Sequence, residues 1–375
     1  MLHLKEFLIF LLALKVHLIL GHDNFPLNLY HNIDKNNSNV VISPFSVEQS
    51  LSIMALGAYG STASELHDIL GHDEDVLLNS LKIHSTSYIT ANRIYVRTDR
   101  KLNENFQSTI EKRIGYAVGE SIDFKNGQNA AQQINEWVSN QTDQKIKDLV
   151  DPNVITSDTR VILVNAIYFK GIWKNKFPKD NTFTRKFYLN DKDFKDVEFM
   201  QLKTDFKFNR FEDLKASVVE LPYQTENIAM YVILPNERTG LDELLSKFHT
   251  TDFEKDIVEK LEEQKVDVTL PRFKTEFNVN LNMALKNMGA KMMFSNAADF
   301  RNLLSSPEPI QLSDIIHKAV IEVNEEGVVA TAATEGQLIS RCAPICEYLV
   351  AEYPFLYVIY DRTDKHVLFI GEIRE

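Results

Sequence analysis

The sequence contains only two cysteines among 375 residues, Cys342 and Cys346. Two thiols cannot build the disulfide framework of a small secreted domain or the four-ligand site of a structural zinc ion. Glycine and proline are also scarce, at 13 and 11 residues, and they are scattered rather than gathered into linkers or repeats. The length alone would allow two or three domains of about 150 residues, but the sequence offers no boundary at which to divide the chain.

Basic residues are outnumbered: the chain has 41 Lys and Arg against 53 Asp and Glu, for a formal net charge of −12. Nucleic acids and anionic membranes are recognised by positively charged surfaces, so neither is an expected partner. Hydrophobic residues make up 44% and charged residues 25%, which is typical of a globular protein and excludes a disordered one. The sequence also lacks Gly-x-Ser-x-Gly, His-Glu-x-x-His and phosphate-loop motifs. We therefore expect no enzymatic activity, cofactor or metal.

The N-terminal segment has the features of a targeting signal. An unbroken apolar run, Phe7–Leu14, follows a lysine, and a shorter run ends at Gly21, a small residue suited to signal peptidase. The whole stretch is shorter than the roughly 20 residues needed to span a bilayer. We expect residues 1–21 to be a secretory signal peptide and the protein to be extracellular; the alternative is an amphipathic first helix. Sequons at Asn36 and Asn140 are compatible with glycosylation during secretion.

Helical patterns gather early in the chain and strand patterns late, which indicates an α+β fold. Capping-box motifs at Ser46–Gln49 and Thr62–Glu65 predict that helices begin there. The nearly all-apolar run Val161–Phe169 predicts a central strand buried on both faces. Two later hairpins are expected, one with its turn at residues 224–227 and one across residues 361–365.

One residue of the predicted central strand is polar. An unsatisfied amide at Asn165 would cost about 1–3 kcal/mol, so its side chain should have specific polar partners. Ser43, Ser46 and His317 are candidates. The alternative is an inward-facing amide bonded only to backbone.

Residues 325–347 form a long segment without clear helical or strand signals, and such loops are usually functional or disordered. Polar residues are sparse here, which argues against disorder. On an extended chain, Glu335 and Gln337 share one face, and the other face is small or apolar. The loop is therefore patterned as a strand with one buriable face, and it is a candidate conformational switch. An ordinary edge strand with a connection remains the alternative.

An ordered set of motifs runs along the chain. It comprises Asn39–Ser46, Gly57–Leu66, Ile134–Val138 with Thr142 and Lys145–Ile146, Val164–Trp173, Glu220–Tyr223, His317–Val320, and Glu325–Gly327 followed by an alanine-rich stretch. Together these motifs resemble the serpin family over nearly all of residues 25–375. The resemblance implies one domain over residues 22–375, a monomer with three β-sheets, about nine helices and an exposed reactive-centre loop at about residues 325–350.

The resemblance also assigns roles to individual residues. A polar network beneath the main sheet, called the shutter, maps onto Ser43, Ser46, Asn165 and His317. Trp173 maps onto the breach, where the loop first enters that sheet. The hinge of the loop maps onto Glu325, Gly327, Val328, Ala330, Ala332 and Ala333. Small residues suit rapid insertion, and valine at 328, where the family usually has Thr or Ser, is uncharged and should still enter the sheet.

In inhibitory serpins the scissile bond lies fourteen residues beyond the hinge glycine, and this count from Gly327 reaches Arg341. Arg341 is also the only basic residue between Glu325 and Glu347. The resemblance therefore implies cleavage between Arg341 and Cys342 by a trypsin-like serine protease, whose specificity pocket carries an aspartate. The cleaved loop would insert into the main sheet and trap the protease as a covalent acyl-enzyme.

Several alternatives stay open. A non-inhibitory serpin would act as a carrier or binding protein, although its hinge would typically contain bulky or charged residues. A heparin site is not expected, because basic residues are sparse around Lys82 and His84. Cys342 and Cys346 form an intraloop disulfide by one hypothesis, and they remain free or pair between molecules by the other.

Overall fold

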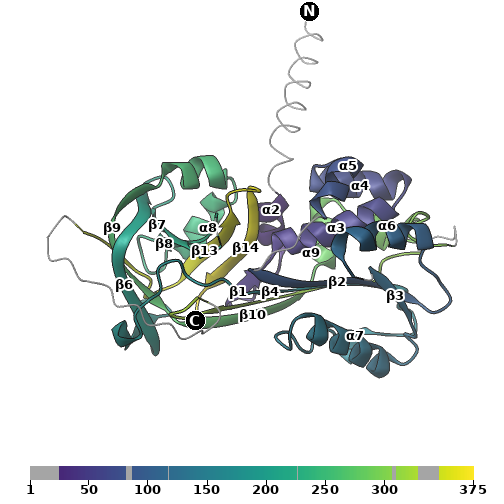
Figure 1. Ribbon diagram of the computed structural model, residues 1–375, viewed down its shortest axis with the longest axis horizontal. Helices are drawn as coiled ribbons and strands as arrows, with labels where there is room; N and C mark the ends of the chain where they lie inside the picture. The colour runs from purple at the N-terminus through teal and green to yellow at the C-terminus, as the bar shows by residue number, and fades with distance from the viewer. Residues whose placement is uncertain (1–24, 82–86, 117, 226, 306–309, 328–345) are drawn as a thin grey trace, which may run out of the picture.

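The computed structural model describes residues 25–81, 87–116, 118–225, 227–305, 310–327 and 346–375 (Figure 1). The predicted signal peptide lies outside these residues, and so do the sites predicted at Val328, Ala330, Ala332, Ala333, Arg341 and Cys342. No helix in the described part of the chain is long and apolar enough to cross a membrane.

The elements confirm the predicted α+β class. The α-helices are α2 (Phe25–Asn32), α3 (Pro44–Gly57), α4 (Gly60–Leu70), α5 (Glu74–Ser80), α6 (Glu104–Ile114), α7 (Gly127–Gln141), α8 (Leu241–Phe248) and α9 (Asn282–Met288). The strands are β1 (Val40–Ile42), β2 (Tyr88–Arg97), β3 (Gly119–Ile122), β4 (Val161–Phe169), β5 (Thr182–Tyr188), β6 (Phe194–Phe211), β7 (Ala216–Pro222), β8 (Ile228–Pro235), β9 (Glu262–Pro271), β10 (Phe273–Asn280), β11 (Asp314–Val323), β12 (Glu347–Val350), β13 (Phe355–Asp361) and β14 (His366–Ile373).

A five-stranded sheet has the order β10-β11-β4-β2-β3. Every residue of β4 is buried, as predicted for a central strand covered on both faces. β4 and β11 run parallel to each other, and their register sets Asn165 beside His317. Their outer neighbours β2 and β10 are antiparallel to them.

The remaining strands form one nine-stranded sheet, in which β5 pairs with β6 and the others follow the order β1-β14-β13-β8-β7-β6-β9-β12. The 18-residue strand β6 pairs with β5, β7 and β9. Because β6 is shared, two of the three sheets that the resemblance implied are joined by continuous hydrogen bonding. Both predicted hairpins are confirmed, as the antiparallel pairs β7–β8 and β13–β14.

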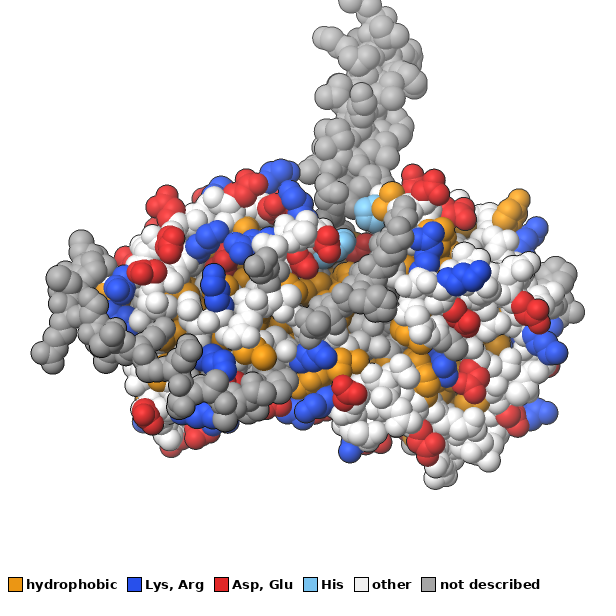
Figure 2. All heavy atoms as spheres, viewed as in Figure 1, with side chains coloured by type: hydrophobic (Ala, Val, Ile, Leu, Met, Phe, Trp, Pro, Cys, Tyr) orange, Lys and Arg blue, Asp and Glu red, His pale blue; other side chains and the backbone are white. Residues whose placement is uncertain are grey.

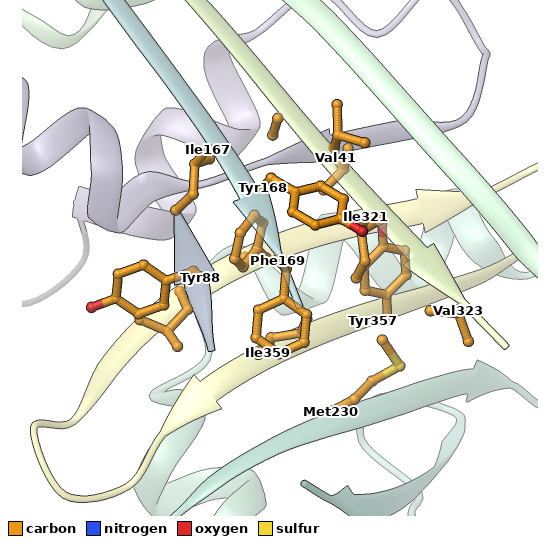
Figure 3. Packing of buried hydrophobic residues seen from close by; sticks show 14 of the residues in the cluster. Val41, Tyr88, Ile167, Tyr168, Phe169, Met230, Ile321, Val323, Tyr357 and Ile359 are labelled. Carbon is orange, nitrogen blue, oxygen red and sulfur yellow. The ribbon is translucent and has the colours of Figure 1, made fainter. Parts of the chain in front are cut away.

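The five-stranded sheet is covered on both faces. α3 lies on one face and α7 on the other (Figure 1). Large apolar side chains fill the space where β4 and β11 meet β8 and β13, among them Phe169, Ile321, Met230 and Tyr357 (Figure 3). On the molecular face in Figure 2, Lys and Arg side chains are interspersed with Asp and Glu and form no basic stripe.

The two capping-box predictions gave wrong helix starts. α3 begins at Pro44, because the N-cap is Ser43, whose hydroxyl accepts a hydrogen bond from Ser46 N. α4 begins at Gly60, two residues before Thr62. The hydroxyl of Thr62 instead accepts a hydrogen bond from the backbone of Asp299, so a side chain with the sequence pattern of a cap serves a tertiary contact.

Candidate functional site

A buried polar network joins the start of α3 to the middle of β4 and β11. Ser43, Ser46, Asn165 and His317 are each 0% exposed. The backbone N–H of Ser43 donates to His317 Nε2 at 3.1 Å, so that nitrogen carries no proton. His317 Nδ1 therefore carries the proton and donates it to Asn165 Oδ1. The neutral imidazole thus ties the helix N-terminus to both parallel strands.

The amide of Asn165 completes the network. Its Nδ2 group lies within hydrogen-bond distance of Asn92 Oδ1 at 2.5 Å, Ser46 Oγ at 2.6 Å, Ser46 O at 2.9 Å and Ser50 Oγ at 3.0 Å. Asn165 therefore has the polar partners expected of a buried amide. Asn92 and Ser50 were missed from the sequence. The sequence held a signal for Ser50, which follows Ser46 by one helical turn, whereas Asn92 meets Asn165 through the register of β2 against β4.

The network is neutral at physiological pH. Burial lowers the pKa of His317 to about 3, because the protonated ring would lose its hydration. A neutral, fully bonded cluster avoids the cost of a buried charge. It therefore holds β4 and β11 together in addition to their backbone hydrogen bonds.

A second cluster lies beyond the end of β4, around Trp173. This side chain is 1% exposed and stacks on Tyr223, with ring centroids 4.4 Å apart. Its indole Nε1 donates to Asn324 O at 2.8 Å, and its backbone N–H donates to Glu326 O at 3.0 Å. Trp173 thus anchors the segment that leaves β11.

Glu325, a predicted hinge residue, and its neighbour Glu326 are also held in place by polar contacts. Glu326 Oε2 lies 2.7 Å from Lys176 Nζ, and this hydrogen bond keeps the pKa of the Glu326 carboxyl below its usual value. Glu325 accepts a hydrogen bond from Thr182 Oγ1 at 2.7 Å and lies 3.5 Å from Arg272. Both residues are only 7% exposed, so burial and polar contacts fix the position of the chain directly after β11.

Gly327 reverses the chain direction after β11. Its N–H donates to Asn324 O at 3.1 Å, and its carbonyl accepts from Asn324 N at 3.0 Å. Its φ is +113°, and a Cβ atom there would lie 2.3 Å from Gly171 O. Only glycine fits both the backbone conformation and the space.

The bridges of Gly327 fix its place between two strands. Gly327 forms antiparallel bridges with Ile172, just beyond β4, and with Asn324, just beyond β11. It therefore lies between the continuations of β4 and β11 and runs antiparallel to both. A strand that continued from Gly327 in this direction would separate the parallel pair and bond to each member.

The other predicted sites are surface features. Asn36 and Asn140 are both exposed, and Asn36 has a φ of +46° in a turn after α2. Cys346 is half-buried, and its thiol lies 3.4 Å from Glu347 O. The predicted bond to Cys342 falls outside the described residues.

Known proteins resemble this chain over most of its length. A family model for "Serpin (serine protease inhibitor)" matches residues 21–375. Serine protease inhibitor 42Dd of Drosophila melanogaster is 38% identical, over 90% of this chain and 91% of that protein. The leukocyte elastase inhibitor of Homo sapiens is 36% identical, over 94% of this chain and 97% of that protein. Among solved structures, Serpin48, a highly specific serpin in the insect Tenebrio molitor, has a TM-score of 0.85 and 31% identity, covering 94% of this chain and 96% of that one.

Proposed function

The chain belongs to the serpin family, and on that premise we propose that it is a secreted inhibitor of trypsin-like serine proteases, cleaved after Arg341. The observation that carries the inhibitory mechanism is the position of Gly327. It already occupies the place between the extensions of β4 and β11 where an inserted strand would begin, and β4 and β11 are still paired with each other.

The protease serine would attack the carbonyl carbon of Arg341. The bond to Cys342 would then break, and the protease histidine would pass the serine proton to the new amino group. The product is an ester between the Arg341 carbonyl and the protease serine, and the leaving group is the peptide that begins at Cys342. Distortion of the protease before water attacks this ester would make the complex permanent.

Strand insertion supplies that distortion. The residues from Val328 to Ser340 number thirteen, and at about 3.3 Å each they span about 43 Å. Their insertion would replace the parallel contact between β4 and β11, which covers residues 314–320 and 162–168, by two antiparallel contacts. Antiparallel pairing is slightly more stable per residue, so cleavage would release a favourable rearrangement.

The proposed specificity for trypsin-like proteases is based on Arg341 and not on the targets of the relatives. The similar proteins include an elastase inhibitor of Homo sapiens and an antichymotrypsin and an antitrypsin of Bombyx mori, so membership of the family does not choose a target. The guanidinium of Arg341 would pair with the aspartate in the specificity pocket of a trypsin-like enzyme. The sequons at Asn36 and Asn140, both exposed, are compatible with the proposed secretion.

Incubation with trypsin tests this function. We expect a complex that survives SDS and boiling and has the combined mass of trypsin and residues up to Arg341, together with release of the C-terminal peptide. Arg341→Ala should abolish this complex, and Arg341→Lys, which keeps a charge for the same pocket, should retain it. Cleavage after Arg341 without a stable complex would instead favour the carrier or binding protein, and a complex formed equally by Arg341→Ala would show that another bond is attacked.

A further inference from the structure

A hollow of about 370 Å³ opens beside β12, whose residues are the last ones of the predicted reactive-centre loop. Residues from β12, from the segment after it, and from the ends of β6, β7 and β8 line it. We call the part of the hollow beside β12 the Tyr348 face, defined by Arg210, Tyr348, Val350 and Tyr353. No residue with a role in the shutter or the breach belongs to it.

Tyr348 is unusually exposed for an aromatic side chain. Its exposed fraction is 62%, whereas the next residue, Leu349, is 1% exposed. The alternation shows that β12 buries one face and presents Tyr348 on the other. Tyrosine is enriched in protein interfaces, because it offers a large rigid surface with a polar tip.

The one charged side chain of the Tyr348 face, Arg210, is paired. The Arg210 guanidinium, 60% exposed, lies 2.6 Å from the Glu347 carboxylate. Tyr353 lines the same hollow, and its hydroxyl donates a hydrogen bond to Pro235 O at 2.9 Å. The Tyr348 face is therefore an aromatic surface beside a neutralised ion pair, and it matches an apolar or aromatic partner surface better than a strongly charged one.

The occupant follows from the length of chain between this face and the bond that the protease cleaves. Tyr348 follows Arg341 by seven positions, so the two are at most about 25 Å apart. A compact protease of about 230 residues has a radius of gyration of about 17 Å and is about 45 Å across. A protease with its active site on Arg341 is thus larger than the connecting chain, so its body is large enough to touch the Tyr348 face.

We propose that the Tyr348 face is a second contact surface for the target protease, touched by the protease surface next to the leaving-group side of its cleft. This inference rests on the proposed function. The contact would raise the rate of docking and would separate proteases that share a preference for arginine. It would leave strand insertion unchanged, because the shutter and breach residues are elsewhere.

The test uses the full chain and two forms of trypsin. Active trypsin reports the inhibitory function through the SDS-stable complex. Trypsin whose catalytic serine is replaced by alanine reports docking alone, through its dissociation constant. The variant is Tyr348→Thr, which keeps a residue suited to a strand. The control is Tyr59→Thr, since Tyr59 is 52% exposed and also lies beside an arginine. Tyr59 directly precedes α4, at the opposite end of the molecule from β9 (Figure 1).

We expect Tyr348→Thr to weaken binding of inactive trypsin about tenfold, the effect of losing one central interface residue, and to slow formation of the covalent complex by a similar factor. The number of inhibitor molecules consumed per protease should not change. A change of less than twofold, or an equal change in Tyr59→Thr, would overturn the inference. If wild-type protein is cleaved without a covalent complex, the inhibitory function is wrong, and the dissociation constants still decide whether trypsin contacts this face.

Discussion

Replacing Asn165 by alanine should loosen the contact between β4 and β11. The side chain is fully buried, accepts a hydrogen bond from His317 Nδ1, and donates to Asn92 and to Ser46. Alanine removes all of these bonds and leaves the His317 N–H without an acceptor inside the protein. The two parallel strands would then be held mainly by their backbone pairing.

The expected loss of stability is about 3 kcal/mol. A buried donor left without a partner costs about 1–3 kcal/mol. The loss of the bond to Asn92, whose Oδ1 would keep only a 3.5 Å contact with Ser46 Oγ, adds about 1 kcal/mol. With an unfolding entropy of about 2.1 cal/mol/K per residue, a domain of about 350 residues has about 0.7 kcal/mol/K in total. A loss of 3 kcal/mol then lowers Tm by about 4 °C.

Urea denaturation and thermal unfolding measure this loss. The control is Asn105→Ala, because Asn105 is exposed in the first turn of α6 and its replacement should change stability by no more than about 0.5 kcal/mol. A synthetic peptide with the sequence of residues 328–340 gives a second measurement. It should anneal into the Asn165→Ala protein faster than into wild type, as a shift on native gels. Equal stability and equal annealing in the two variants would refute the role of this amide in holding the strands.

Two further predictions concern the breach and the pH dependence of stability. Gly327→Ala should destabilise the fold by about 2 kcal/mol more than Gly289→Ala. Both glycines have a positive φ, +113° and +117°, but only at Gly327 would an added Cβ overlap a neighbour, at 2.3 Å from Gly171 O. Equal urea midpoints for the two variants would contradict this prediction. The unfolded state protonates His317 below pH 6.5 and the folded state only near pH 3, so stability is lost as the pH falls through this window. Compared with His317→Gln, the wild-type protein should lose about 2 kcal/mol of unfolding free energy between pH 7 and pH 5. If the difference in unfolding free energy between the two proteins stays constant over this range, the folded histidine is accessible to protons.

The strands were the most predictable part of the fold. β4 spans Val161–Phe169, the bounds of the apolar run. The bounds were predictable because a strand buried on both faces is apolar up to both of its ends. Helix starts were less predictable. The hydroxyl of Ser46 lies 2.6 Å from Asn165 Nδ2, so it serves the network while Ser43 caps the helix, and no local pattern separates these two uses.

Only the part of the candidate site that depends on Asn165 could be predicted from the sequence. The cost of burying an amide in β4 made Asn165 conspicuous before its partners were known. Asn92 could not be found in this way, because it meets Asn165 only through the register of β2 against β4. Register depends on how whole strands pack, and a shift by one residue would turn the Asn92 side chain to the other face.

The sequence by itself determined the α+β class, the central strand, the two hairpins and the similarity to a family, because each follows from short-range patterns of apolar, polar and turn-forming residues. Only the tertiary structure decided that β4 and β11 lie side by side and parallel, and that Gly327 stands between their extensions with its chain reversed. The contacts of β4 with β11, and of Ile172 with Gly327, join residues more than 150 positions apart. They depend on which strands become neighbours in the sheet, and no local pattern in the chain encodes that choice.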